Sequence, residues 1–148
     1  MTTMKWKRLA LIVAALVVAA LGCYYLRGLM MLGYVDSAIV RVRVISEAEV
    51  EFARAHPQSG YTCTISDLPR SEEITRLVAQ GFTDNGYVFE IVGCEKVEPG
   101  KPNSIYYITA RPLHSGQPAF CSDPSRVLKS DKSGSVERCI AKGIPVGG

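Results

Sequence analysis

Apolar residues are concentrated near the start of the chain. Leu9–Leu26 contains no charged side chain. As an α-helix this segment would be about 27 Å long, close to the roughly 30 Å hydrocarbon layer of a bilayer. Because apolar side chains continue beyond it, we predict a transmembrane helix over residues 9–35.

The charges beside this segment predict its orientation. Three positive residues precede it, whereas only Arg27 follows it closely. The positive-inside rule places residues 1–8 in the cytoplasm and residues 36–148 on the far side of the membrane. We therefore expect a single-pass protein of the inner membrane, in contact with membrane lipid, whose C-terminal domain is periplasmic or extracellular.

The same stretch allows two other interpretations. A basic segment followed by an apolar one is also typical of a cleaved export signal. Ala20-Leu21-Gly22 fits such a cleavage site fairly, and with Cys23 it weakly resembles a lipoprotein signal in which that cysteine would be lipidated. Apolar character that continues at Leu29–Leu32 favours the retained anchor. In that case Cys23 is a small apolar helix residue.

After the anchor, the apolar residues become periodic. They recur every three or four positions, with charged residues mostly between them, which predicts a helix with one buried face. Pro57 disfavours helical geometry at His56 and ends the pattern. We predict one helix from Leu9 to about Ala55, with a bend near Gly28 and Gly33 because glycine weakens helices. The expected packing residues are Val35, Ile39, Val42, Ile45, Ala48 or Glu49, and Phe52.

The remaining sequence predicts a short helix and an antiparallel sheet. Ser71–Gln80 has a capping serine, two early glutamates and a glycine after its end. Consecutive β-rich segments joined by short loops indicate a meander. The fold class is α+β, a long N-terminal helix packed on a small antiparallel β-sheet. The predicted strands are Tyr87–Val92, Ile105–Ala110, Ala119–Ser122 and Arg126–Lys129.

Four of the five cysteines lie after the predicted long helix. An even number in a small exported domain indicates two disulfides, for which three pairings are possible. We favour Cys121–Cys139, which ties the C-terminal tail to the third strand, and Cys63–Cys94, which ties the loop after the long helix to the end of the first strand. No Cys-x-x-Cys occurs, and no cysteine and histidine spacing fits zinc, so we expect a structural role.

The sequence contains no recognisable catalytic motif. His56 and His114 are the only histidines, neither in a nucleophile motif, and Asp123 lies in a Cys-Ser-Asp-Pro turn where hydrogen bonding within the turn is expected. Net charge is +3 and no basic run follows Arg8, so we expect no nucleic acid partner. We expect no enzyme activity, cofactor or metal, and we identify no small-molecule substrate.

Three stretches carry a family resemblance: AIVRVRVISEAEVEFARAHPQSGYTCTISDL, GYVFEIVGC and YYITARPLHSGQPAFCSDPSRVLKS. They contain, in order, Gly60-Tyr61, the Gly-Tyr-x-Phe at Gly86–Phe89, and the Phe-Cys-x-Asp at Phe120–Asp123. This order resembles the type IV pilin and type II secretion pseudopilin families. The resemblance implies a pilin-like structural subunit of a filament or of a secretion or pilus assembly. Its partners would be further copies or other pilin-like subunits.

The N-terminus differs from that family pattern. Pilin precursors carry a glycine followed by phenylalanine or methionine before the apolar helix, and a glutamate one turn into it. Here Leu9 follows Lys7-Arg8, and no carboxylate side chain occurs before Asp36. We therefore expect no prepilin peptidase processing and no methylated N-terminus, and in a fibre Leu9–Val35 would pack without glutamate pairing.

A second interpretation comes from a different functional class. The chain would be an anchored or lipidated extracytoplasmic binding module that holds a ligand with its sheet or with the loop Glu98–Ser104. Isolation as a lone lipoprotein would favour this interpretation over the structural subunit.

Overall fold

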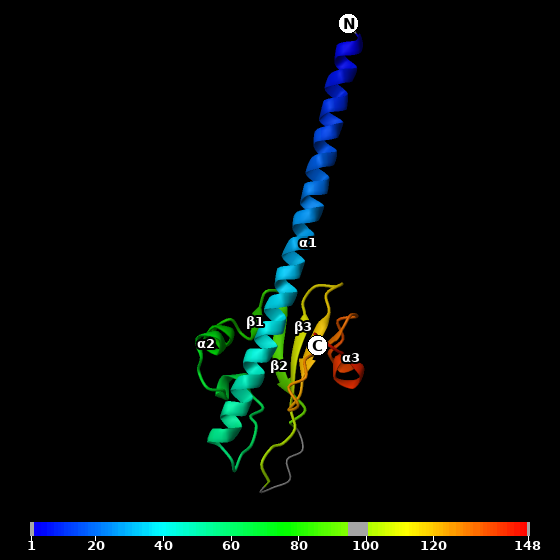
Figure 1. Ribbon diagram of the computed structural model, residues 1–148. Helices are drawn as coiled ribbons and strands as arrows, with labels where there is room; N and C mark the ends of the chain where they lie inside the picture. Colours follow the sequence, from blue (N-terminus) through cyan, green and yellow to red (C-terminus); the bar gives the residue numbers. More distant parts are fainter. Residues whose placement is uncertain (1, 95–100, 148) are drawn as a thin grey trace. The chain divides into compact units, whose positions relative to one another are not determined.

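The computed structural model describes residues 2–94 and 101–147. It divides into two units, Met1–Gly33 and Tyr34–Gly148. Figure 1 shows the elements in colours that follow the chain. The helices are α1 (Thr2–Ala55), the 3₁₀ helix η1 (Ile65–Asp67), α2 (Glu72–Ala79) and α3 (Val136–Lys142). The strands are β1 (Thr83–Asp84), β2 (Tyr87–Val92), β3 (Tyr107–Pro112), β4 (Ala119–Ser122), β5 (Lys129–Asp131) and β6 (Ile144–Pro145).

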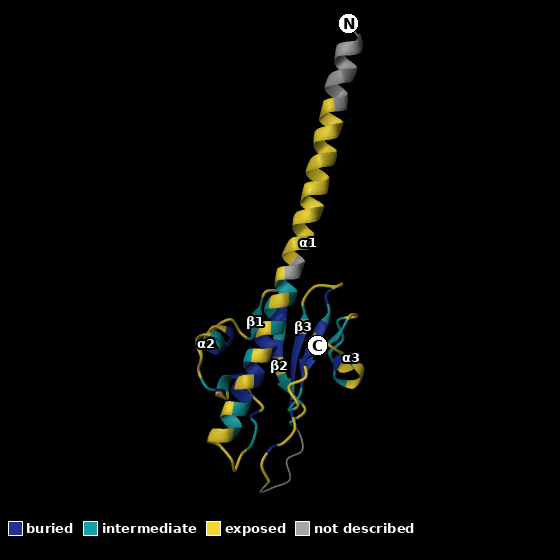
Figure 2. Cartoon of the chain, viewed as in Figure 1, coloured by how far each residue is buried: buried dark blue, intermediate teal, exposed yellow. Residues whose placement is uncertain are grey.

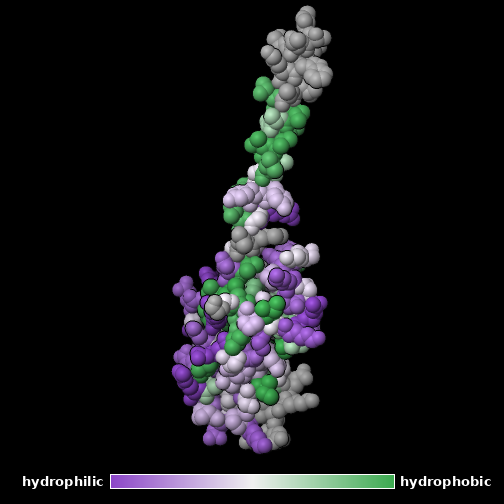
Figure 3. All heavy atoms as spheres, turned by 45° about the vertical axis from the view of Figure 1, so that its right-hand side comes forward, coloured by the Kyte–Doolittle hydropathy of each residue, from purple (hydrophilic) through white to green (hydrophobic). Residues whose placement is uncertain are grey.

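The first unit is helical throughout its described residues. Every side chain described in residues 11–30 is exposed, and Arg27 is the only charged one (Figure 2). Figure 3 shows hydrophobic residues gathered along this part of the helix. Among the described residues, one helix is long and apolar enough to cross a membrane, although an export signal would satisfy the same criterion. The helix continues through Gly28 and Gly33, and the bend there stays a prediction.

The second unit contains a six-stranded antiparallel meander in the order β1-β2-β3-β4-β5-β6. The α+β class, the long helix and the antiparallel sheet are therefore confirmed. Two strands have the predicted bounds, Tyr87–Val92 and Ala119–Ser122. The predicted short helix also forms, with the Ser71 hydroxyl accepting from the Ile74 N–H at 3.2 Å.

The predicted strand Arg126–Lys129 is wrong, because β5 begins only at Lys129. Arg126 has φ of 61°, in the left-handed region that a strand excludes. Its N–H donates to the Asp123 carbonyl at 2.8 Å, so the turn extends through the positions assigned to the strand. The second predicted strand is shifted, since β3 begins at Tyr107 instead of Ile105. Four further elements, η1, β1, α3 and β6, were not predicted from the sequence.

The core of the second unit joins α1 to the sheet. Val42 and Ile45 are fully buried, while Val35, Ile39 and Phe52 are partly buried against the same core. Figure 2 shows this alternation of buried and exposed residues along the lower part of α1. The sequence left open whether Ala48 or Glu49 faces inward, and both do. Other large core side chains are Ile65, Leu68, Ile74, Leu77, Tyr87, Phe89, Tyr106, Ile108, Phe120 and Leu128.

Candidate functional site

A buried polar cluster interrupts the hydrophobic core. It consists of Ser46 and Glu49 on α1 and Tyr106 directly before β3. Their exposed fractions are 4%, 0% and 0%. The Glu49 Oε2 accepts a hydrogen bond from the Thr62 N–H at 3.0 Å. The cluster therefore links α1 to the loop that follows it and to the chain entering β3.

Three polar atoms of this cluster have no partner at full hydrogen-bond geometry in the described part of the chain, although the Ser46 and Tyr106 hydroxyls lie close enough to interact with each other. They are Ser46 Oγ, Glu49 Oε1 and the Tyr106 hydroxyl. Burial raises the pKa of Glu49 to about 7, opposed by the hydrogen bond from Thr62. Burial also raises the pKa of Tyr106 to about 12, while the nearby Ser46 hydroxyl acts against the increase. Glu49 thus changes its charge near neutral pH inside the core.

Ser46 also lines a groove beside α1. The groove has a volume of about 360 Å³ and lies between α1 and the segment that connects β4 to β5. Its lining combines two arginines, one glutamate, three serines and two apolar residues. The lining residues are Val42, Arg43, Ser46, Glu47, Ser122, Ser125, Arg126 and Leu128.

A second groove, of about 390 Å³, has the opposite charge. Glu47, Glu51 and Glu73 line it together with a single arginine, Arg70. Glu47 lines both grooves. The exposed ridge of α1 therefore has an arginine-containing groove and a glutamate-rich groove beside it. Such a surface suits electrostatic recognition of a partner.

A buried ion pair fixes the start of the sheet to α1. The Arg41 Nε donates to the Asp84 Oδ2 at 2.7 Å, and their side chains are only 8% and 11% exposed. Next to it, the Asn85 amide donates to the Ser37 hydroxyl at 2.8 Å. Removing one member of a buried ion pair leaves an uncompensated charge, so this contact constrains where β1 can lie.

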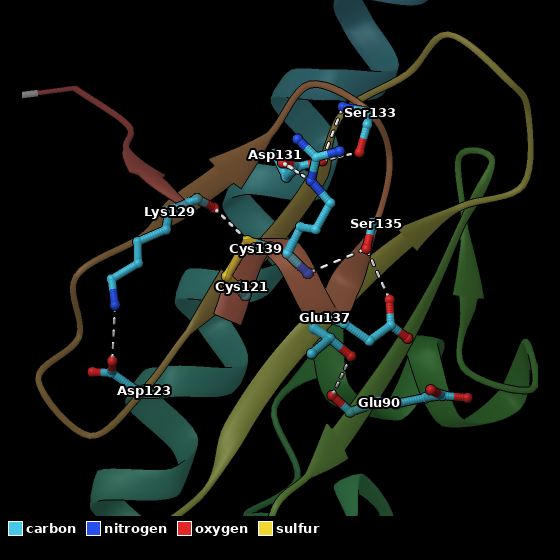
Figure 4. The surroundings of a disulfide bond; sticks show 11 residues. Glu90, Cys121, Asp123, Lys129, Asp131, Ser133, Ser135, Glu137 and Cys139 are labelled. Atoms are coloured by element: carbon cyan, nitrogen blue, oxygen red, sulfur yellow. Dashed lines mark hydrogen bonds and ion pairs between the residues drawn. A yellow bond between two sulfur atoms is a disulfide. The ribbon is translucent and has the colours of Figure 1, made fainter. Parts of the chain in front are cut away.

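Disulfides join Cys63 to Cys94 and Cys121 to Cys139, the pairing favoured from the sequence. Figure 4 shows that the second one ties α3 to β4. The cap of α3 is visible beside it, where the Ser135 hydroxyl accepts from the Arg138 N–H and donates to Glu137.

The residues that the sequence offered for chemistry do not belong to the polar cluster, although the charge of Asp123 contributes to the raised pKa of Tyr106. The His56 ring stacks on Phe52 at the end of α1, and its Nδ1 bonds the Phe52 carbonyl. His114 is exposed in the loop between β3 and β4. Asp123 accepts from Ser125 within its turn, as expected, and pairs with Lys129 at 3.3 Å. No group of three metal-binding side chains comes together in the ranges the structure describes.

The loop Glu98–Ser104 is described only from Lys101 onward, so Glu98–Gly100 lie outside the described residues. Asn103 is buried and organises the described part. Its side-chain amide donates to the Tyr61 backbone carbonyl at 3.1 Å, and its backbone carbonyl accepts from the Tyr61 N–H at 3.0 Å. This loop is therefore connected to the segment that follows α1.

From the sequence, Glu49 was expected only as an alternative to Ala48 on the packing face of α1, and Ser46 was not expected to have a role. The signal available was the helical period, because Glu49 follows Val42 by seven positions and so falls on the same face. A glutamate on a buried face requires a partner. That partner, a backbone N–H thirteen residues away, has no sequence signature.

Neither a family model, a curated protein nor a solved structure matches the chain.

Proposed function

We propose that this chain is a membrane-anchored, pilin-like or pseudopilin-like structural subunit. It acts by helix packing and protein docking in a filament or in a secretion or pilus assembly. The observation that supports this best is the change in character along α1. Residues 11–30 expose apolar side chains, whereas the helix from Ala38 onward buries one face in a sheet domain. A helix that is apolar on all sides needs lipid or other apolar helices around it.

The proposed location is the inner membrane, with residues 1–8 in the cytoplasm and the sheet domain on the other side. Two disulfides in the second unit support an oxidising compartment for that domain. Further support comes from the charges near the helix, because three positive residues precede the apolar stretch. The family resemblance of the three quoted stretches supports the pilin-like part of the proposal.

Intact mass of the protein purified from its own membranes tests the anchor. A mass near 16.1 kDa would correspond to the full chain and thus to a retained helix. A mass that begins at Cys23 and includes acyl chains would instead support the lipidated binding module. A chain cut without acylation would refute the anchor altogether.

Crosslinking tests self-association separately from anchoring. Cys23 is exposed on the helix and is a free thiol. If copies pack along this helix, mild oxidation in native membranes should give a dimer that Cys23→Ser abolishes. Replacing Leu16 by cysteine in the Cys23→Ser background then tests, by the same oxidation, whether two copies also contact each other at this second position of the helix. Full-length anchored protein that forms no dimer at any position from 11 to 30 would reject helix packing between copies.

A further inference from the structure

The second unit contains the last two residues of the predicted anchor. Tyr34 and Val35 belong to this unit and are partly buried against its core. They also end the helix that we predict over residues 9–35, which at about 40 Å spans a bilayer together with its headgroup layers. The sequence therefore provides no spacer between the sheet domain and the proposed membrane. This end of the domain lies at the level of the lipid headgroups.

Two loops of the sheet lie at the same end of the second unit (Figure 1). In the turn between β1 and β2, the Asn85 amide donates to the Ser37 hydroxyl at 2.8 Å. Ser37 is only two residues beyond Val35, which corresponds to about 3 Å along the helix. The Leu113 N–H, at the start of the loop between β3 and β4, donates to the Gly86 carbonyl of that turn at 2.8 Å. The loop that begins at Leu113 is therefore held near the membrane-proximal turn of α1.

This loop presents an apolar side chain to its surroundings. Leu113 is 50% exposed, and His114, which follows it, is exposed as well. A single exposed leucine is ordinary on a surface that faces water. At the headgroup level, however, an apolar side chain gains free energy by entering the lipid, and an imidazole suits this layer because its body is apolar and its tip is polar. The position of Leu113 is thus what points to a lipid contact.

Charges of both signs surround the loop. Arg111 and Lys132 are exposed, but Asp36 and Glu137 are exposed too, and Glu137 interacts electrostatically with Arg111. The cations near this end are therefore opposed by acids. A surface of this kind has no strong preference for anionic lipid, so the apolar side chain determines the contact.

We propose that the loop Leu113–Gly116 docks on the lipid headgroup layer of the membrane that holds α1, with Leu113 as the inserted side chain. This contact rests on the proposed anchor and adds an orientation to it. The end of the sheet domain that carries this loop lies against the bilayer. The opposite end, where the loop after α1 and the start of β3 lie, faces away from the bilayer and is accessible to protein partners.

Tryptophan fluorescence of the full chain in phosphatidylcholine vesicles tests the contact. Trp6 is the only tryptophan in the sequence, so each reporter is introduced singly into a Trp6→Phe background. Leu113→Trp should be quenched at least about twofold by lipid that carries a nitroxide on its headgroup. Ile105→Trp is the matched control, because Ile105 is 54% exposed and precedes the strand that Leu113 follows. The six residues of β3 separate the two sites by about 20 Å, so the control should lose less than about a tenth of its emission.

A third reporter separates this proposal from the anchor itself. Leu16→Trp lies in the predicted transmembrane segment and should be quenched by lipid that is brominated in its acyl chains. Without that quenching the anchor is refuted, and the docking with it. Quenching of Leu16→Trp but not of Leu113→Trp would leave the anchor intact and overturn only the docking. Equal quenching of Leu113→Trp and Ile105→Trp by the headgroup nitroxide would mean that the domain lies on its side, which also overturns docking through this end.

Removing the leucine tests its contribution without a tryptophan at its position. With His114→Trp as the reporter, Leu113→Ser should reduce quenching by the headgroup nitroxide at least about twofold. Replacing part of the phosphatidylcholine by phosphatidylglycerol should leave the quenching unchanged, because the charges near the loop oppose each other. Unchanged quenching after Leu113→Ser, or quenching that requires the anionic lipid, would overturn the assignment of Leu113 as the inserted side chain.

Discussion

Glu49 should make the stability of the protein fall as the pH rises toward neutrality. In the unfolded chain its carboxyl has the ordinary pKa of 4.5, whereas burial raises the pKa to about 7 in the folded protein. Between these values the folded state keeps a proton that the unfolded state has lost. Stability is therefore fully present below pH 4.5 and decreases until the pH passes 7.

The two pKa values set an upper limit on this effect. Each pH unit between them corresponds to 1.36 kcal/mol, so the full difference is at most about 3.4 kcal/mol. Local relaxation and water penetration around a buried carboxylate lower the penalty, so the expected effect is about 1–2 kcal/mol. Glu49→Gln keeps the shape and an acceptor for the Thr62 N–H but cannot ionise. It should therefore be more stable than the wild type at pH 8 by that amount, and nearly equal to it at pH 4.5.

The assay is guanidinium unfolding of the full chain in detergent micelles, followed by near-ultraviolet circular dichroism at pH values from 4.5 to 8.5. The difference between variant and wild type removes the contributions of other titrating groups. Glu47→Gln is the control, because Glu47 is exposed on the same helix. A difference for Glu49→Gln that stays constant across this pH range, or that matches the control, would refute the argument.

Three further predictions concern contacts that hold the second unit together. Gly60→Ala should lower the free energy of unfolding by at least about 2 kcal/mol, because the new Cβ would overlap the backbone of the loop before β3 and the residue has a φ of +74°. Gly116→Ala, at a φ of +84° but with open space around the position, should lower it by only about 1–2 kcal/mol in the same assay. Equal losses for the two variants would contradict the overlap. Asp84→Asn should lower the free energy of unfolding by about 3 kcal/mol, because it leaves Arg41 buried and without its ion-pair partner. Arg138→Gln removes a side chain that is 70% exposed and should lower it by less than about 1 kcal/mol. Equal unfolding midpoints for the two variants would refute this distinction between buried and exposed ion pairs. Reducing both disulfides should lower the melting temperature, because bonds that close loops of 18 and 31 residues contribute about 3–4 kcal/mol each to the free energy of unfolding. An unchanged melting temperature after complete reduction, verified by mass, would contradict this.

Local sequence signals predicted those parts of the fold that local interactions decide. The helical period over Val35–Phe52 identified the core-facing residues of α1, and a capping serine with a terminating glycine identified α2. The same reasoning could have found α3, because Ser135 caps it and Gly143 follows it. The sequence signal for α3 is therefore of the same kind as the one for α2.

The errors around β5 and the buried cluster have a different origin. Arg126 adopts a left-handed conformation that its residue type rarely takes, since the Asp123 turn and the strands on either side of it determine its backbone. The polar cluster depends on Tyr106 and Thr62, which approach Glu49 only after the sheet and the loop after α1 have formed. Periodicity in a sequence identifies which face of a helix is buried, but it does not identify the residues that pack against that face.

A final prediction separates what Glu49 contributes to global stability from what it does locally. At pH 4.5, where Glu49 is protonated in the folded protein, Glu49→Met should change the unfolding free energy by less than about 1 kcal/mol, because the gain from an apolar side chain in the core offsets the lost hydrogen bond. The Thr62 N–H would lose its acceptor, and its hydrogen exchange should accelerate by about tenfold relative to wild type. The Asn103 N–H, which donates to the Ser59 carbonyl at 2.8 Å, is the internal reference and should be unaffected. Because the adjacent Cys63–Cys94 disulfide still holds this loop in the variant, we expect faster hydrogen exchange only at the amide that lost its acceptor. Equal acceleration at both amides would instead mean that the whole loop opens and that Glu49 holds it closed.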